Sequence, residues 1–200
     1  MIIYFARHGQ TELGEKHCFE GVSDSNLTIL GKDQARRLGE MLKDKNINRI
    51  ISSPKKRARQ TAEIVSQILK IDIEIDETWL EMSYGGWEGK AKEDLKNFPE
   101  WKIREKNKYH FLHPGQACGA RGESYQLLYN RLKPELDKLM KNFPKDNIVI
   151  ICHIGILRSV NKYFNNLSPK ETTIFTPSNE TLIKIIKEAY NKIKLEIIKY

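Results

Sequence analysis

Short apolar runs separated by amphipathic stretches constrain the fold of this chain most strongly. The strand-like runs cover residues 2–6, 47–52, 71–75 and 148–152. Strands that alternate with helices predict a mostly parallel sheet covered by helices on both faces. Two later alternating runs, 181–186 and 192–198, flank residues 188–191 and predict a closing hairpin. We therefore expect an α/β fold: a three-layer α/β/α sandwich whose mostly parallel central sheet has an antiparallel edge.

Helix signals fall between and after these strands. Thr28 is a good N-cap for a helix over residues 29–43, and Ser53 with Pro54 predicts the start of a second helix. Apolar residues at helical spacing predict a long helix that ends near residue 142, and a further helix is expected around residues 156–165.

The alternation of strands and helices fails between residues 79 and 122. Glycine, tryptophan, tyrosine, histidine and charged residues accumulate there. We interpret this stretch as an inserted lid of helices and loops over the sheet. Because the sequence contains no internal repeat and no low-complexity linker, we expect one domain over residues 1–200.

The charge and the cysteines restrict the partners and the compartment. The net charge of +8 favours an anionic ligand. The lysines are scattered, and the one dense basic cluster, residues 55–59, lies at a predicted helix start, so we do not expect a nucleic-acid partner. Three widely spaced cysteines argue against a disulfide framework. With no membrane span or secretory signal in the sequence, we expect a cytoplasmic protein without a membrane partner. The oligomeric state stays open, with a homodimer as one option.

Four segments place reactive side chains where predicted strands end, or shortly afterwards. The first strand runs directly into Arg7-His8-Gly9, and the last parallel strand ends at Cys152-His153. Arg57 follows the second strand, and Glu81 precedes a Gly-Gly-Trp-Glu-Gly run. The carboxyl ends of parallel strands share one edge of a sheet, where ligands bind. An imidazole with fixed positive charges around it suits phosphoryl transfer, which needs an in-line nucleophile and a clamp on the phosphate oxygens.

These motifs, in this order, resemble those of the histidine phosphatase superfamily, also called phosphoglycerate mutase-like, whose hallmark is an Arg-His-Gly near the N-terminus. Further matching positions are Gly21, Leu27-Thr28, Gly31, Gln34-Ala35 and Gly122-Glu123-Ser124. The resemblance implies that His8 is the nucleophile and that Arg7, Arg57 and His153 hold the phosphate. It also implies that Glu81 is the proton donor and that neither a metal nor another cofactor is required.

Several assignments have rivals. Glu88 and Glu77 are alternatives to Glu81 as the general acid. The acid must lie within hydrogen-bond distance of the leaving oxygen, and the sequence does not give that distance. A zinc site built from His110, His113 and Cys118, with His17 and Cys18 elsewhere, matches no standard spacing. The aromatic residues Trp87, Trp101, Tyr109 and Phe111 form either an apolar substrate lid or a small core of the insertion.

A second group of residues is predicted to contact the substrate. Gly14 replaces an Asn found in many relatives, which widens the pocket, and Ile154 follows His153 where relatives often have glycine, which narrows it. Arg59 belongs to this group or lies on a helix surface. The predicted substrate-binding residues are Gln10, Thr11, Gly14, Glu20, Gly21, Arg59 and Ile154.

The sequence thus predicts a phosphomonoester hydrolase that acts through a phosphohistidine on His8. The Trp87-Glu88-Gly89 element resembles the branch of broad-specificity phosphatases and α-ribazole phosphatase, so α-ribazole phosphate, a sugar phosphate or a nucleotide phosphate is a candidate substrate. Cofactor-dependent phosphoglycerate mutases carry an arginine after the acid, where this chain has Met82, which favours hydrolysis. A non-catalytic basic binding module is the alternative from another class.

Overall fold

A six-stranded sheet forms the centre of a computed structural model that describes residues 2–142, 145–188 and 192–200. The strand order is β3-β2-β6-β1-β7-β8. Neighbouring strands from β3 to β1 run parallel, whereas β7 pairs antiparallel with β1 and with β8. The strands are β1 (Ile2–Arg7), β2 (Ile47–Ser52), β3 (Ile73–Ile75), β6 (Asn147–Cys152), β7 (Thr181–Lys187) and β8 (Ile193–Lys199). The predicted sandwich with an antiparallel edge is confirmed, while the hairpin turn at residues 189–191 lies outside the described residues.

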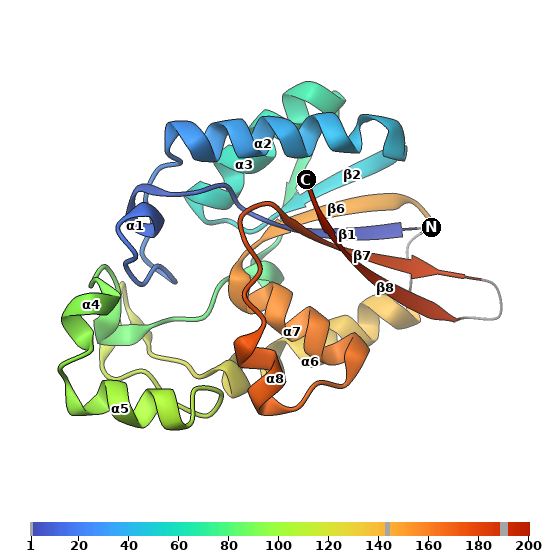
Figure 1. The fold of residues 1–200 in the computed structure, drawn as a ribbon. Coiled ribbons are helices and arrows are strands. Elements are labelled where there is room, and N and C mark those ends of the chain that lie inside the picture. The colour runs from blue at the N-terminus through green and yellow to red at the C-terminus, as the bar shows by residue number, and fades with distance from the viewer. Residues whose placement is uncertain (1, 143–144, 189–191) are drawn as a thin grey trace.

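Helices cover both faces of this sheet (Figure 1). On one face lie α2 (Ile29–Leu42) and α3 (Lys56–Leu69), and on the other lie α6 (Tyr125–Lys141), α7 (Ile154–Asn165) and α8 (Pro169–Ile174). Side chains alternate across a strand, so β1 contributes to two cores. Ile3 and Phe5 pack in the core under α6 and α7, and Tyr4 and Ala6 pack in the core under α2 and α3.

The register of the central strands brings three strand ends to one edge. Arg7 of β1 pairs with Cys152 of β6, and Ser52 of β2 pairs with Ile151. Beyond the strands, the His8 amide donates to the Cys152 carbonyl at 3.0 Å, and the Ser53 amide donates to the Ile151 carbonyl at 3.0 Å. The residues that follow β1, β2 and β6 therefore leave the sheet together.

Two predicted helix starts were wrong by about two residues. The second helix, α3, begins at Lys56 rather than at Pro54, because an acidic residue from a distant loop caps it. The Asp24 carboxylate accepts from the backbone amides of Lys56 and Arg57, while the hydroxyl of Ser53 contacts His153 at 2.8 Å and accepts from the Lys55 amide at the longer distance of 3.4 Å. Helix α7 begins at Ile154, directly after its N-cap His153.

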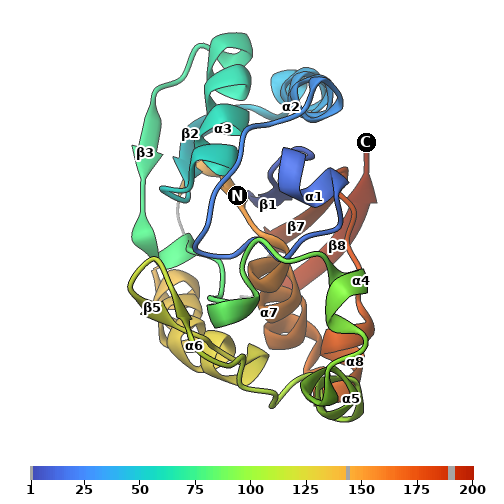
Figure 2. The same cartoon turned by 90° about the vertical axis from the view of Figure 1, so that its left-hand side faces the viewer.

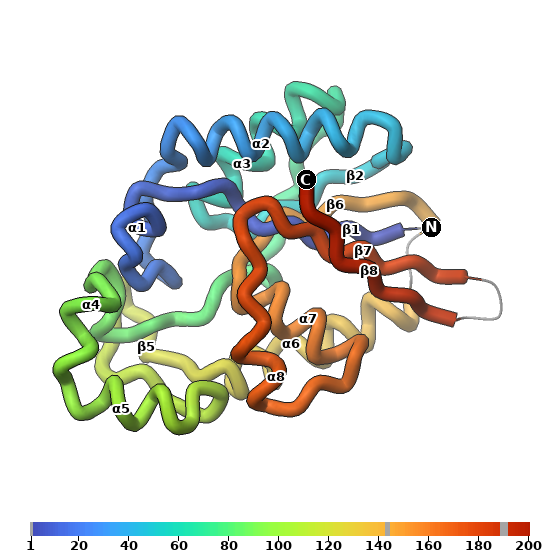
Figure 3. The backbone as a smooth tube through the Cα atoms, viewed as in Figure 1, coloured from blue at the N-terminus to red at the C-terminus, as the bar shows by residue number. Residues whose placement is uncertain are grey.

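The segment between β3 and α6 contains short elements (Figure 2). These are two 3-10 helices (Glu77–Trp79 and Gly85–Trp87), α4 (Lys92–Leu95), α5 (Pro99–Lys106), β4 (Gln116–Ala117) and β5 (Ala120–Arg121). Figure 3 shows α4 beside α1 (Glu12–Glu15), and an antiparallel bridge joins Cys18 to Ala91. No helix within the described ranges is both long and apolar enough to cross a membrane.

An aromatic cluster occupies the interior of this segment. Trp87 stacks on Trp101 with ring centroids 5.9 Å apart, and Phe111 lies 5.3 Å from Trp87. Tyr109 is also buried, and none of these four residues lines the pocket described below. Of the two options for these aromatic residues, the structure favours a small core of the insertion.

Candidate active site

His8 follows β1 and is held as a neutral imidazole. Its Nδ1 lies 2.8 Å from the Gly9 carbonyl oxygen, which can only accept, so Nδ1 carries the hydrogen and Nε2 keeps its lone pair. Burial of the side chain, and then the charges of Arg57 and Arg7, lower the pKa of His8 well below its usual range. The arrangement therefore presents an unprotonated Nε2 at neutral pH.

His153 lies beside His8 at the end of β6. The centroids of the two rings are 5.2 Å apart. The Nε2 of His153 lies 2.8 Å from the Ser53 hydroxyl, and its buried Nδ1 has no hydrogen-bond partner among the described residues. If the hydroxyl donates to Nε2, the ring proton lies on Nδ1, which becomes a donor for an anion. Burial, followed by Arg57 and His8, lowers the pKa of His153 well below its usual range.

Arg7 and Arg57 place two guanidinium groups next to the imidazoles. Arg57 is fully buried, and its terminal nitrogens donate to the Ser23 and Gly21 carbonyls at 2.8 Å each and to the Asp24 carboxylate at 3.1 Å. Arg7 donates to the Pro177 carbonyl at 3.1 Å. In each arginine the buried Nε has no partner within the part of the chain described.

Buried donors without partners are costly, because such a group has lost its water without a replacement. Three of these nitrogens belong to Arg7, Arg57 and His153, which lie close enough that each arginine charge shifts the pKa of His153. An anion with several oxygens, such as a phosphate, would satisfy donors of this kind.

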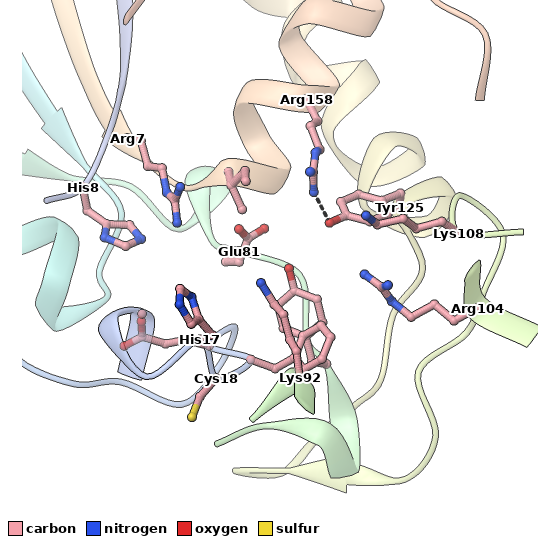
Figure 4. Close-up of a pocket in the computed structure, with 15 residues that line it drawn as sticks. Arg7, His8, His17, Cys18, Glu81, Lys92, Arg104, Lys108, Tyr125 and Arg158 are labelled. Atoms are coloured by element: carbon pink, nitrogen blue, oxygen red, sulfur yellow. Dashed lines mark hydrogen bonds between the residues drawn. The ribbon is translucent and has the colours of Figure 1, made fainter. Parts of the chain in front are cut away.

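Glu81 is a buried carboxyl that lies between Arg7 and Arg158 in the pocket (Figure 4). Its two oxygens accept from the Met82 amide at 2.8 Å and from the Gly155 amide at 2.9 Å. A Cβ on residue 155 would lie 2.2 Å from Glu81 Oε1, so a glycine is required at this close approach. Burial raises the pKa of Glu81, although the two amides and Arg57 oppose the shift. A carboxyl of this kind keeps its proton at higher pH than a solvated glutamate does.

The two rival acids have other surroundings. The Glu88 carboxylate accepts from the backbone amides of Gly21, Val22 and Tyr84 at 2.8–3.1 Å, so it anchors a loop. Glu77 is exposed. Neither lines the pocket, whereas Glu81 does.

Four cations that the sequence analysis did not identify line the same pocket, which has a volume of about 150 Å³. Figure 4 shows Arg104, Lys108 and Arg158 across the pocket from Arg7 and His8, with Lys92 below Glu81. Each is one basic residue in a lysine-rich sequence, so no local signal separates these four from the exposed ones.

The cations of this cluster are partly desolvated. Arg158 donates from Nε to the Phe175 carbonyl at 2.8 Å and from Nη1 to the Tyr125 hydroxyl. The buried Nε of Arg104 has no partner among the described residues, and its guanidinium lies 5.4 Å from the Phe19 ring centroid. Burial and the Arg104 charge lower the pKa of Lys92 and bring that of Lys108 to about 8. Arg104 also pairs with the Glu105 carboxylate, and the positive charge of the other three cations remains along the wall of the pocket.

Of the predicted substrate-binding residues, Gly14, Glu20 and Ile154 line the pocket. Gln10, Thr11 and Gly21 lie behind it: the amide oxygen of Gln10 accepts from Thr28, Thr11 caps α1, and the Gly21 amide donates to Glu88. Arg59 is exposed on α3 and borders a separate surface hollow with Asp24. The structure does not bring Arg59 to the reactive histidines.

The residues of the hypothetical zinc site have other environments. Among the described residues, no three His, Cys, Asp or Glu side chains form a group that could hold a metal ion. His113 packs against aromatic rings and lies 2.8 Å from the Glu123 carbonyl, and burial lowers its pKa to about 4.

Comparisons with known proteins match nearly the whole chain. The model of the histidine phosphatase superfamily (branch 1) matches residues 3–197. "Putative phosphoserine phosphatase 2" of Hydrogenobacter thermophilus is 35% identical over 162 residues, which cover 79% of this chain and 75% of that protein. Human 6-phosphofructo-2-kinase/fructose-2,6-bisphosphatase 4 is 30% identical over 94% of this chain, but the chain spans only 38% of that enzyme. The structure of the α-ribazole phosphatase from Shigella flexneri superposes with a TM-score of 0.86, covering 100% of this chain and 96% of that one; at 21% identity it supports the fold alone.

Proposed function

The chain belongs to the histidine phosphatase superfamily, and from this membership we propose that it hydrolyses small phosphate monoesters through a phosphohistidine on His8. The observation that carries the proposal is the neutral His8, with Nδ1 held by the Gly9 carbonyl and unpartnered donors beside it. The free lone pair on Nε2 is the nucleophile.

The first step transfers the phosphoryl group to the enzyme. Nε2 of His8 forms a bond to phosphorus while the ester P–O bond breaks, and Glu81 gives its proton to the departing oxygen. The ring becomes positively charged, and the Gly9 carbonyl stabilises it through the Nδ1 hydrogen. Arg7, Arg57 and His153 supply donors for the equatorial oxygens.

The second step returns the enzyme to its starting state. The Glu81 carboxylate takes a proton from water, the water oxygen forms a bond to phosphorus, and the P–N bond breaks with its electron pair returning to His8. Inorganic phosphate leaves, Glu81 is protonated again, and His8 is neutral. This route assigns no step to a metal ion.

We further propose that the substrate carries a second anionic group, a carboxylate or another phosphate. The cluster formed by Lys92, Arg104, Lys108 and Arg158 supports this class, because all four cations line the pocket and three of them lie across it from His8 (Figure 4). Two of the relatives have names that contain phosphoserine or fructose 2,6-bisphosphate, and each of these esters carries two anionic groups. An α-ribazole, simple sugar or nucleoside monophosphate has one such group and would leave Lys92, Lys108 and Arg158 without an anion of the substrate.

Phosphoglycerate mutase activity is the alternative that shares this anion-binding end. Met82, at the position where mutases carry an arginine, is fully buried and offers no charge to the pocket. Hydrolysis is therefore preferred. The relatives reported above are enzymes by name, so the binding module for nucleic acid receives no support from them.

The test is hydrolysis of phenyl phosphate, glycerol 3-phosphate and 3-phosphoglycerate in the presence of a chelator. Wild type should hydrolyse all three, His8→Ala should lose at least about a thousandfold in kcat, and His110→Ala, at an exposed histidine, should retain full activity. Retained turnover in His8→Ala would refute the phosphohistidine route. Rapid conversion of 3-phosphoglycerate to 2-phosphoglycerate in the presence of 2,3-bisphosphoglycerate would establish the mutase instead.

A further inference from the structure

We infer that Arg131, on α6, is a positioning residue that acts together with Glu123 to hold the acid Glu81 in place. The inference rests on the proposed function, because Arg131 acts only through Glu81. Arg131 does not line the pocket and was not identified by any sequence motif considered above.

The contacts of Arg131 join the helix to the backbone that carries the acid. Its Nη2 donates to the carbonyl of Leu80 at 2.9 Å and to the carbonyl of Glu81 at 3.1 Å. Its Nε donates to Oε1 of Glu123 at 3.0 Å. One planar guanidinium thus binds two successive carbonyls and is itself oriented by a carboxylate.

Glu123 holds the other end of the same segment. Its Oε2 accepts from the Ser83 amide at 3.0 Å, and its own amide donates to the Ser83 carbonyl at 2.8 Å. The Arg131–Glu123 pair therefore forms hydrogen bonds with the backbone of Leu80, Glu81 and Ser83, on both sides of the peptide that joins Glu81 to Met82.

The segment needs such support because it is not part of a helix or strand. It runs between the 3-10 helices Glu77–Trp79 and Gly85–Trp87, so no ladder of a sheet fixes its backbone. The Glu81 carboxyl must nevertheless meet two amides, those of Met82 and Gly155, at 2.8 and 2.9 Å. A displacement of about 1 Å in such a group can cost about a hundredfold in rate.

Arg131 also acts on the acid electrostatically. Burial raises the pKa of Glu81, and the Gly155 and Met82 amides, Arg57 and Arg131 oppose the rise, in that order. The other titratable groups that interact with the carboxylate are Arg7, Tyr84 and Cys152. Removal of the Arg131 charge therefore raises the pKa of Glu81 further, and the protonated acid persists to higher pH.

The experiment compares Arg131→Met and Arg131→Lys with Lys133→Met, a control on the same helix whose exposed side chain pairs with Asp137. Substrates are phenyl phosphate, which needs protonation of its leaving oxygen, and 2,4-dinitrophenyl phosphate, which does not. We expect Arg131→Met to lower kcat/KM, which reports the transfer to His8 and not the later attack of water, about 10- to 100-fold for phenyl phosphate and less than about threefold for the dinitrophenyl ester.

The pH profile separates positioning from general damage. In Arg131→Met the alkaline limb of kcat/KM for phenyl phosphate should move to higher pH. Arg131→Lys keeps the positive charge but loses the planar guanidinium that donates to two carbonyls. The alkaline limb should therefore return toward its wild-type pH, while the larger loss on phenyl phosphate than on the dinitrophenyl ester should remain. Lys133→Met should match wild type in both readouts. Circular dichroism confirms folding of each variant, and Glu123→Gln, which weakens the same clamp, replaces Arg131→Met if that protein does not fold.

Equal losses on the two substrates, or an unmoved alkaline limb in Arg131→Met, would overturn the inference. Glu81→Gln distinguishes this outcome from failure of the proposed function. If Glu81→Gln shows the selective loss on phenyl phosphate and Arg131→Met does not, only the role of Arg131 fails. If Glu81→Gln shows no selectivity in kcat/KM, the assignment of the acid itself fails.

Discussion

Lys108 provides a quantitative test of the proposed second anion site. It follows α5, is half-buried, and lines the pocket with Arg104 and Arg158. Burial and these two charges lower the pKa of Lys108 to about 8. A lysine with this pKa is about nine-tenths protonated at pH 7 and about one-tenth protonated at pH 9. The contribution of Lys108 to the attraction for a second anion is therefore present below pH 8 and is lost above it, while Arg104 and Arg158 stay charged.

Lys108→Met removes the charge and keeps most of the apolar stem. A hydrogen bond between charged groups contributes about 1.5–3 kcal/mol, and we take the lower end because Lys108 is partly exposed. This corresponds to a loss of about tenfold in kcat/KM for a two-anion substrate at pH 7. With the protonated fractions above, wild type should lose about fivefold between pH 7 and pH 9, and the variant should show no such loss.

The assay compares 3-phosphoglycerate with glycerol 3-phosphate, which has a hydroxymethyl group in place of the carboxylate. Deprotonation of Glu81 slows both esters alike, so the ratio of kcat/KM for 3-phosphoglycerate to that for glycerol 3-phosphate isolates Lys108 and should fall with Lys108→Met or with the rise in pH. Lys106→Met, at an exposed neighbour at the end of α5, is the matched control and should behave as wild type. Equal losses for the two esters in Lys108→Met, or a flat wild-type ratio from pH 7 to pH 9, would refute the second anion site.

Other predictions concern the phosphate site and the acid. Gly155→Ala places a methyl group 2.2 Å from Glu81 Oε1 and 2.6 Å from Leu128 Cδ2, so urea denaturation should show a loss of about 1–3 kcal/mol; an unchanged midpoint would contradict the packing. Glu88→Ala leaves the amides of Gly21, Val22 and Tyr84 without their acceptor and should destabilise the protein by about 1–3 kcal/mol in the same assay, whereas wild-type stability would show that the anchor is dispensable. Protonation of His8 blocks attack, and its pKa is lowered well below 6.5, so kcat/KM for phenyl phosphate should fall only in acid well below pH 6.5; an acid limb at or above that value would contradict a neutral His8.

The sequence predicts the features that follow from the parallel strands, namely the layered architecture and the pairing of His8 with His153. The residues that follow β1 and β6 are adjacent in space because parallel strands end at one edge, so His8 and His153 could be paired without a structure. The order of hydrophobic runs was sufficient for the sandwich. These predictions depend on local periodicity and on a general property of parallel sheets.

Tertiary contacts determine the parts that were missed. The start of α3 depends on Asp24, which lies 32 residues before Lys56 in the chain. Arg104 and Arg158 become pocket residues only through the packing of the insertion on α7. Arg59 is a different case: residues two apart on a helix are separated by about 200°, so Arg57 and Arg59 cannot both face the same ligand. Helix geometry alone favoured placing Arg59 on the surface.

The central claim is a covalent phosphoryl group on His8, and it can be trapped directly. In Glu81→Gln, 2,4-dinitrophenyl phosphate needs no acid for transfer, but water lacks its base, so the phosphoenzyme should accumulate. Rapid mixing, alkaline quenching and peptide mass spectrometry should then find one phosphate on the peptide with His8, stable in base and released in acid, alongside a stoichiometric burst of dinitrophenol. A burst with the phosphate on another residue, or steady turnover with no phosphate on His8, would contradict the account.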